Sequence, residues 1–223
     1  MISDLLSTYE LAKTAVIGRG FEHEIRWQNS LSFDDLSESD FLKELAWVVM
    51  SSGMREVVVR RLFPCLSKAF LDWESALLIV SREAQCRTRA LRCFNNDRKI
   101  RAIIAGARIV NAIGFDNLKG EIRHAPIETL RKFQYIGPVT SLHLAKNIGL
   151  PMAKPDRHLV RIAALEGYED VQDLCEDISR LTGDTVPVVD IVFWRFATIE
   201  PHYRNLFGDT HGQYDGFSGG NSV

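Results

Sequence analysis

The chain has 223 residues, of which 46% are hydrophobic and 25% are charged, and its formal charge at pH 7 is −2. These proportions are typical of a globular domain and exclude both a fibrous repeat and a chain that is disordered throughout. A charge so close to zero also excludes a surface that is basic everywhere, so a polyanionic partner would have to bind a local patch.

Helical patterns run through most of the chain. A Ser37–Asp40 capping box precedes an apolar pattern over 41–50, and a second helix is predicted from about Glu56 to Phe70, after a break at 51–53. Further helices are predicted over 73–81, 99–112, 126–133, 138–148, 157–165, 170–181 and 188–196. The last of these is apolar enough for a strand, but its pattern continues past strand length, so we favour a helix.

The predicted elements define an all-α fold of ~9–11 short helices. Residues 1–207 are expected to form one helical domain. Residues 208–223 are rich in Gly, Ser, Asn and Asp, so we expect them to form a mobile tail that buries no core.

The four cysteines form no CxxC pair and are too sparse for a secreted disulfide scaffold. We therefore expect reduced thiols at Cys65, Cys86, Cys93 and Cys175 in a cytoplasmic protein, associated with the nucleoid in a bacterium. The N-terminal segment lacks an apolar run of signal-peptide length, and the most apolar stretch falls far short of the ~20 residues of a membrane helix. No membrane partner is expected.

Basic residues concentrate in two segments. Residues 82–108 contain eight basic and two acidic residues, and residues 131–161 contain six basic and one acidic residue. A chain that is close to neutral overall can still bind phosphates through such a stripe. The plainer alternative is a solvated face on two helices.

The segment from Ile127 to Ile162 carries most of the chemical information. Its first two helices are joined by a short connection that ends at Gly137, which can adopt a positive φ, and Pro138 suits the first position of the second helix. Unpaired N–H groups from Gly137 to Thr140, together with the helix dipole, would form an anion site for a phosphate. An ordinary capped helical corner is the alternative.

A loop over 149–156 then leads from the hairpin, residues 127–148, to an aspartate. Gly149 should end the second hairpin helix, and two prolines keep the loop extended. Asp156 stands where an N-cap of the next helix is expected. A carboxylate fixed there can also stabilise a positively charged sugar or orient and deprotonate a water molecule.

These features resemble the helix-hairpin-helix (HhH-GPD) DNA glycosylase superfamily, and most of all its monofunctional 3-methyladenine glycosylase-like members. The matching segments are YIGPVTS at 135–141, GLP at 149–151, DRHLVR at 156–161 and the helix that begins SSGMREVVVRRLF at 51. The resemblance implies two helical lobes with the active cleft between them. It also implies an enzyme that binds double-stranded DNA, flips out one modified nucleotide and hydrolyses its N-glycosidic bond.

The resemblance assigns roles to particular residues. Asp156 matches the catalytic aspartate, and the backbone amides of Gly137 and Val139 match those that hold a DNA phosphate. Further DNA contacts are expected from Thr140, Lys154, Arg157, His158 and Arg161. No cofactor is required, although a structural monovalent cation is expected on the carbonyl oxygens that match Arg131, Phe133 and Ile136.

Three departures narrow the expected activity. Lyase members carry a nucleophilic lysine where this chain has Val139, which cannot form a Schiff base. Iron–sulfur members carry four cysteines near the C-terminus, where this chain has only Cys175. No cysteine lies near His23, His202 or His211, so we expect no metal cluster. Because Val139 replaces the lyase lysine, we also expect no strand cleavage by that route.

A base pocket needs aromatic and polar side chains. The candidates are Trp27 with Glu24, Trp47, Glu56 as a reader of the base edge, and Met54 as a wedge in the stack. Each has a plainer alternative: a core aromatic or methionine, or an exposed helix charge. His158 is equally well explained as a buried, hydrogen-bonded histidine.

The sequence does not name the excised base. An alkylated or otherwise modified base is expected, in repair or in attack on foreign DNA, by a monomeric enzyme. A non-catalytic helix-hairpin-helix DNA-binding module is the main alternative, although such a module needs no aspartate after the loop. A helical protein-interaction domain would leave the basic segments and the short hairpin unexplained.

Overall fold

The computed structural model describes residues 2–208, which form thirteen α-helices, two short 3-10 helices and their connections, without a strand. The all-α prediction is confirmed, but the expected number of helices was too low. The helices that were missed are α1 (Ile2–Gly18), α2 (Glu22–Asn29), α6 (Glu83–Cys93) and α8 (Phe115–His124). Of these, α2 and α6 are rich in charged residues and bury few side chains, so their apolar pattern is weak. The predicted mobile tail falls almost entirely on residues 209–223, outside the described residues.

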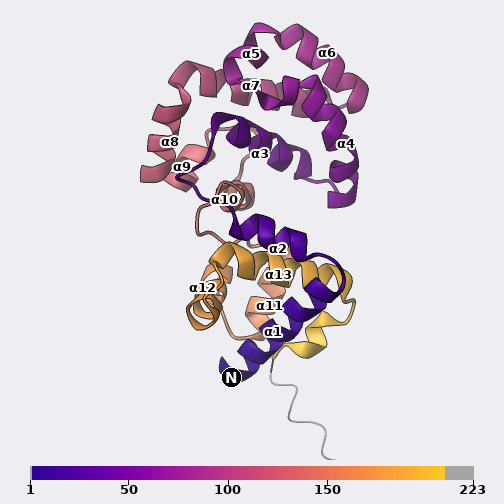
Figure 1. The fold of residues 1–223 in the computed structure, drawn as a ribbon, viewed down its shortest axis with the longest axis vertical. Helices are drawn as coiled ribbons and strands as arrows, with labels where there is room; N and C mark the ends of the chain where they lie inside the picture. Colours follow the sequence, from indigo (N-terminus) through magenta and orange to yellow (C-terminus); the bar gives the residue numbers. More distant parts are fainter. Residues whose placement is uncertain (1, 209–223) are drawn as a thin grey trace, which may run out of the picture. The chain divides into compact units, whose positions relative to one another are not determined.

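The chain divides into two compact units (Figure 1). The hairpin unit consists of Ser30–Lys154, and the aspartate unit combines Met1–Asn29 with the segment from Pro155 onward. The loop over 149–156 therefore contains the boundary between the units, and Asp156 belongs to a different unit from the hairpin.

The hairpin unit is built around α3 (Glu38–Ser51) and α7 (Asp97–Ile113). Around them lie α4 (Glu56–Ala69), α5 (Ala76–Ser81), α6, α8, α9 (Pro126–Leu130) and α10 (Pro138–Asn147). A Cβ at Gly106 of α7 would lie 2.5 Å from Leu45 Cδ2 of α3, so the two helices approach closely and a larger residue there would force the Leu45 side chain to move. Burial of each large side chain in this core contributes about 1.5–3 kcal/mol.

Local capping chemistry fixes several helix ends. The Ser37 side chain accepts from Asp40 N and starts α3, as predicted. By contrast, α5 begins at Ala76 and not at Trp73, because Leu71, Asp72 and Trp73 adopt positive φ and Ser75 supplies the cap. The helix α9 ends at Leu130, three residues earlier than expected.

Gly149 ends α10 in the way the sequence indicates. It follows the C-cap residue Ile148 and has φ +89°. A Cβ at this position would lie 2.6 Å from Phe33 N, so both the backbone conformation and the close contact require glycine.

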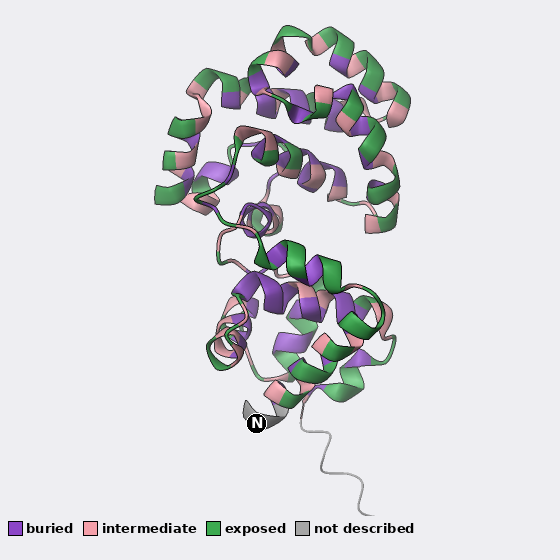
Figure 2. Cartoon of the chain, in the orientation of Figure 1, coloured by how far each residue is buried: buried purple, intermediate pink, exposed green. Residues whose placement is uncertain are grey.

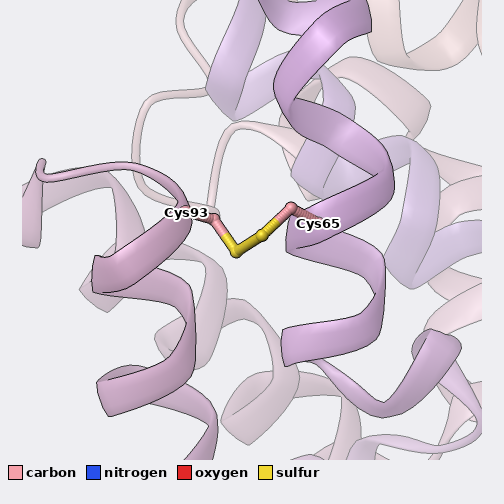
Figure 3. Close-up of a disulfide and its surroundings, with 2 residues drawn as sticks. All are labelled: Cys65 and Cys93. Atoms are coloured by element: carbon pink, nitrogen blue, oxygen red, sulfur yellow. A yellow bond between two sulfur atoms is a disulfide. The ribbon is translucent and has the colours of Figure 1, made fainter.

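A disulfide joins Cys65 of α4 to Cys93 at the end of α6 (Figure 3). The prediction that all four cysteines are reduced is wrong for this pair. Packing of α4 against α6 brings the two Cα atoms to 5.8 Å, within the range a disulfide needs, although 28 positions separate the residues in sequence. Cys86 and Cys175 are free and buried.

The aspartate unit is built around α13 (Val186–Ile199), most of which is buried (Figure 2). The helices α1, α2, α11 (Arg157–Leu165) and α12 (Val171–Thr182) pack against α13, and a 3-10 helix, η2 (Tyr203–Leu206), packs against α11. Because α13 is a continuous helix, the choice of helix over strand for its apolar run is confirmed.

Long-range polar contacts tie the N-terminal helices to this unit. Asp184 Oδ2 accepts hydrogen bonds from Tyr9 Oη and Lys13 Nζ of α1, each at 2.6 Å. Burial and the neighbouring Asp184 carboxylate raise the pKa of Tyr9. These bonds and the edge-to-face contact between the Tyr9 and Phe193 rings fix α1 on the core of the unit.

Candidate functional site

The turn of the hairpin, residues 131–137, differs from the expected geometry. Gly137 lies in the extended region, with φ −98° and ψ −167°, whereas Tyr135 has φ +67°. The residue with positive φ is therefore Tyr135, and the expectation for Gly137 was wrong. An N-cap adopts an extended conformation, which any residue can reach, so the strain of the turn lies at Tyr135.

Thr140 fixes this turn. Its Oγ1 accepts a 2.6 Å hydrogen bond from Gly137 N and donates to the carbonyl oxygen of Tyr135 at 3.0 Å. Within residues 2–208 no hydrogen-bond partner is recorded for the amide N–H of Val139 or Thr140. Two backbone donors at the start of α10 are thus free for an anion, and the Gly137 amide is already satisfied.

The carbonyl groups expected to hold a monovalent cation lie in the same turn. Phe133 O accepts from Ile136 N at 3.2 Å. Among the described residues, no hydrogen bond is recorded to the carbonyl oxygen of Arg131 or Ile136. Their lone pairs therefore remain available for a cation.

Asp156 caps α11 in the aspartate unit. Its Oδ1 accepts from His158 N at 2.8 Å and from Leu159 N at 3.1 Å. Over residues 2–208 the other carboxylate oxygen, Oδ2, has no recorded partner. The cap therefore fixes the orientation of the carboxylate and leaves one oxygen free for chemistry.

The polar residues near Asp156 fall into two kinds. Arg157 and Arg161 are exposed on α11. His158 is half-buried, and its Nδ1 lies 3.1 Å from the hydroxyl of Tyr203. Burial lowers the pKa of His158, although the Asp156 carboxylate opposes the shift. Lys154 lies half-buried on the loop, in the hairpin unit.

Two of the predicted base-pocket residues lie on α2 of the aspartate unit. Trp27 is exposed. The Glu24 carboxylate is buried and accepts hydrogen bonds from Arg195 Nε and Nη2 at 2.7 and 2.5 Å. The guanidinium of Arg195 lies over the ring of Phe21, 4.3 Å from its centroid. Glu24 thus anchors α2 to α13, a role that accounts for its position without a base.

The other three predicted pocket residues lie around the α3–α4 junction of the hairpin unit. Trp47 packs edge-to-face on Phe63. Met54 is half-buried against the core. Glu56 Oε1 accepts from Arg60 Nε at 2.5 Å, within α4. The Arg60 guanidinium also lies 5.9 Å from the centroid of the Trp47 ring, so Arg60 connects Trp47 with Glu56.

A group of arginines that sequence reasoning did not resolve lines a cavity of the hairpin unit. It includes Arg101 and Arg108 of α7, and Gln134 of the hairpin turn also lines it. The signal was present in the sequence, because positions seven apart lie on one face of a helix. The basic excess over 82–108 therefore includes two arginines, Arg101 and Arg108, that share one face of α7.

Formal charge is divided between the two units. The hairpin unit has 19 Lys and Arg against 13 Asp and Glu, a formal charge of +6. The aspartate unit has 8 against 16, a formal charge of −8. The free amides at the start of α10 therefore lie in the basic unit, and Asp156 lies in the acidic one.

Within residues 2–208 no cluster of three or more His, Cys, Asp or Glu side chains is arranged to hold a metal ion. None of the helices described combines the length and apolar composition needed to cross a bilayer.

No model of a known protein family matches the chain, and no curated protein sequence shows significant similarity to it. The features that bear on function are therefore the free amides of the hairpin, the Asp156 carboxylate and the distribution of charge between the units.

Proposed function

We propose that the protein is a monofunctional DNA glycosylase with a two-lobed helix-hairpin-helix architecture. The observation that carries this proposal is the pairing of two local structures on one stretch of chain. A helical hairpin leaves the amides of Val139 and Thr140 free, and a short loop leads from that hairpin to Asp156, whose Oδ2 has no recorded partner in the described chain. The first structure suits a DNA phosphate, and the second suits a developing cation.

The proposed reaction uses only side chains and backbone groups of this chain. The hairpin amides hold a backbone phosphate of a duplex from which a modified base has been flipped. As the C1′–N bond breaks, its electron pair leaves with the base, and the Asp156 carboxylate stabilises the positive charge that develops on the sugar. Water then adds to C1′ and loses a proton to solvent by way of Asp156, leaving an abasic strand.

Strand cleavage through an imine is not expected. Val139 has no nucleophilic atom, and its side chain is 42% exposed at the start of α10. Lys146 lies two turns further along α10, about 10 Å along the helix axis. It is only 4% exposed and cannot easily take over the role. Incubation with a substrate or abasic duplex and sodium borohydride should trap no covalent adduct. An adduct that is lost on mutating one lysine would contradict the monofunctional assignment.

The direct test is a screen of duplexes that each contain one alkylated, deaminated or otherwise modified base. Released base is identified by mass spectrometry, and abasic sites are revealed by strand breakage in hot alkali. We expect release from at least one alkylated or otherwise modified duplex, with the strand intact before alkali.

A non-catalytic DNA-binding module is the second candidate. The observation in its favour is that Asp156 already has a complete structural role as the N-cap of α11. The same screen separates the two proposals. Duplex binding that depends on the hairpin, without base release from any duplex, would favour the module over the enzyme.

A further inference from the structure

The hairpin unit contains a partly open cavity of about 430 Å³ beside the hairpin turn. It is lined by Glu83 and Arg87 of α6, Arg101, Ile104, Ala105 and Arg108 of α7, and Gln134 of the turn. The lining combines charged side chains with an apolar floor. We call it the arginine pocket.

Two carboxylates hold the guanidinium groups of the arginine pocket in place. Asp97 accepts from Arg87 Nε at 2.8 Å and from Arg101 Nε at 2.7 Å. Glu83 accepts from Arg108 Nε at 2.9 Å and from its Nη2. Three guanidinium groups against two carboxylates leave a formal charge of +1 at the pocket. The adjacent guanidinium groups lower the pKa of Asp97, which keeps that carboxylate ionised.

These pairings leave donors unused. Throughout residues 2–208, no hydrogen bond is recorded for the terminal nitrogens of Arg87 and Arg101, for Arg108 Nη1 or for the Gln134 side chain. A planar guanidinium presents a pair of N–H donors that matches two oxygens of a phosphate. Carboxylates behind the guanidiniums reduce the rotamer freedom that binding would otherwise have to remove.

We infer that the arginine pocket binds a phosphate of the DNA backbone, in addition to the phosphate held by the free amides of Val139 and Thr140. This inference rests on the proposed function for the identity of the partner. Gln134 belongs to the same turn that ends at Gly137, so one turn of the hairpin unit lines the pocket and leads to the helix start that bears the free amides.

The helices that line the arginine pocket carry further exposed arginines, and this basic character favours a long polyanion over a small one. On and beside α6 and α7, four more arginines are exposed: Arg82, Arg89, Arg92 and Arg98. The structure records no ion pair for any of them with another described residue. Such a stretch of charge attracts an extended backbone, because each neutralised phosphate releases counterions.

The first test is a double variant with a charge-matched control. Arg101→Gln with Arg108→Gln removes two guanidiniums from the arginine pocket. Arg123→Gln with Arg180→Gln removes two exposed, carboxylate-paired arginines elsewhere. Duplex affinity is measured against salt concentration for wild type and both variants. We expect the slope of log affinity against log salt to become less negative by about 0.9 in the pocket variant. We also expect its affinity at 0.1 M salt to fall by roughly fivefold to tenfold. The control should change both by much less.

A second variant leaves the arginines in place. Ala105→Glu adds a carboxylate to the pocket floor, and the control Leu77→Glu adds one at an exposed position of α5 that does not line the pocket. Circular dichroism and thermal melting establish that each variant is folded. If the inference is correct, Ala105→Glu weakens duplex binding and Leu77→Glu does not.

Base release at saturating protein separates this inference from the proposed function. Loss of affinity in the pocket variants supports the pocket even if no duplex loses a base, an outcome that would overturn only the enzyme. Unchanged affinity and salt slope overturn the pocket even if base release is normal. As a last measurement, inorganic phosphate and a mononucleotide are each titrated into the protein. Binding of either to the pocket, with duplex affinity unchanged in the variants, overturns the assignment to backbone phosphate.

Discussion

The two units differ most in where they place their charges. The hairpin unit has a formal charge of +6 and displays its arginines on exposed helices, whereas the aspartate unit has a formal charge of −8. A basic surface attracts the DNA backbone, and an acidic environment favours a positively charged transition state. A single surface cannot be basic enough to attract the DNA backbone and also acidic enough to stabilise a positively charged transition state. Because the charges are divided between two units, a chain with a net charge of −2 still has a basic unit that can attract a polyanion.

Both units have exposed ion pairs, but the aspartate unit also has a buried one. In the hairpin unit, pairs such as Lys132–Glu121 are more than 40% exposed on both sides. In the aspartate unit, the Glu24 and Arg195 side chains are each 9% exposed. Exposed pairs contribute about 0–1 kcal/mol, whereas breaking a buried pair costs much more because a charge stays buried without its partner. We therefore expect the Glu24–Arg195 pair to contribute more to the fold than the exposed pairs of either unit.

The strongest test of this comparison is Asp156→Asn. Asparagine is as good an N-cap as aspartate, so α11 should remain intact, but the negative charge is lost. We expect base release to fall by at least about a thousandfold, or about 4 kcal/mol in the barrier, with duplex affinity within about threefold of wild type. Single-turnover kinetics and a binding titration measure the two effects.

Asp170→Asn is the matched control, because Asp170 caps α12 in the same unit and also accepts an N–H at 2.8 Å. Base release should be unaffected by it. A rate for Asp156→Asn within about threefold of wild type, a barrier change below about 1 kcal/mol, would place the chemistry elsewhere.

The largest expected effect on stability is at Glu24. Glu24→Gln removes the carboxylate and leaves the Arg195 guanidinium buried without its counter-charge, so we expect a loss of about 3 kcal/mol in the free energy of unfolding. Denaturant unfolding measures this loss. Glu121→Gln breaks the exposed pair with Lys132 and should cost less than about 1 kcal/mol. Equal effects of the two changes would remove the contrast between the units.

A smaller, pH-dependent effect is expected at Glu44 of α3, which accepts a 2.9 Å hydrogen bond from Asn147 Nδ2 of α10. Burial raises the pKa of Glu44 from 4.5 to about 7, with a contribution from Asp40 and opposition from Asn147 and Lys43. The folded state thus favours the neutral carboxyl. Its stabilising contribution is complete below about pH 4.5 and is lost as the pH rises through about 7.

Glu44→Gln keeps a neutral acceptor for Asn147 and should abolish this pH dependence. At pH 8 we expect the variant to be about 1–3 kcal/mol more stable than wild type, and at pH 4 to be equal to it. Urea unfolding at several pH values measures the difference. A variant that is less stable than wild type at pH 8 would show that the ionised carboxylate contributes to the hairpin unit.

The smallest effect is expected at the hairpin turn. Thr140→Val preserves shape but removes the acceptor of Gly137 N and the donor to Tyr135 O, so we expect a loss of about 1 kcal/mol in stability, together with weaker duplex binding. Thr140→Ser keeps the hydroxyl and should restore both. Thermal melting and a binding titration measure the pair. If valine and serine behave alike, the hydroxyl does not fix the turn.

The local structures of the candidate site were largely predictable from sequence. The N-caps at Ser37, Asp156 and Asp170 depend on a side chain and amides two or three residues away, so neighbouring residues suffice to place them. The stop of α10 at Gly149 is equally local. For the same reason the all-α class and the position of the hairpin followed from periodicity and from the Gly137–Pro138 step.

Only the tertiary structure decided the contacts between distant segments. Glu24 and Arg195 are 171 positions apart, and the Cys65–Cys93 pair depends on how α4 packs against α6. Likewise, the positive φ of Tyr135 is a property of the folded turn, and the arginine pocket exists because α6, α7 and Gln134 converge. Hydrogen bonds within a turn join residues that are close in sequence, so they do not depend on how distant helices pack. A buried ion pair or a cavity forms only where packing brings the helices that carry it together.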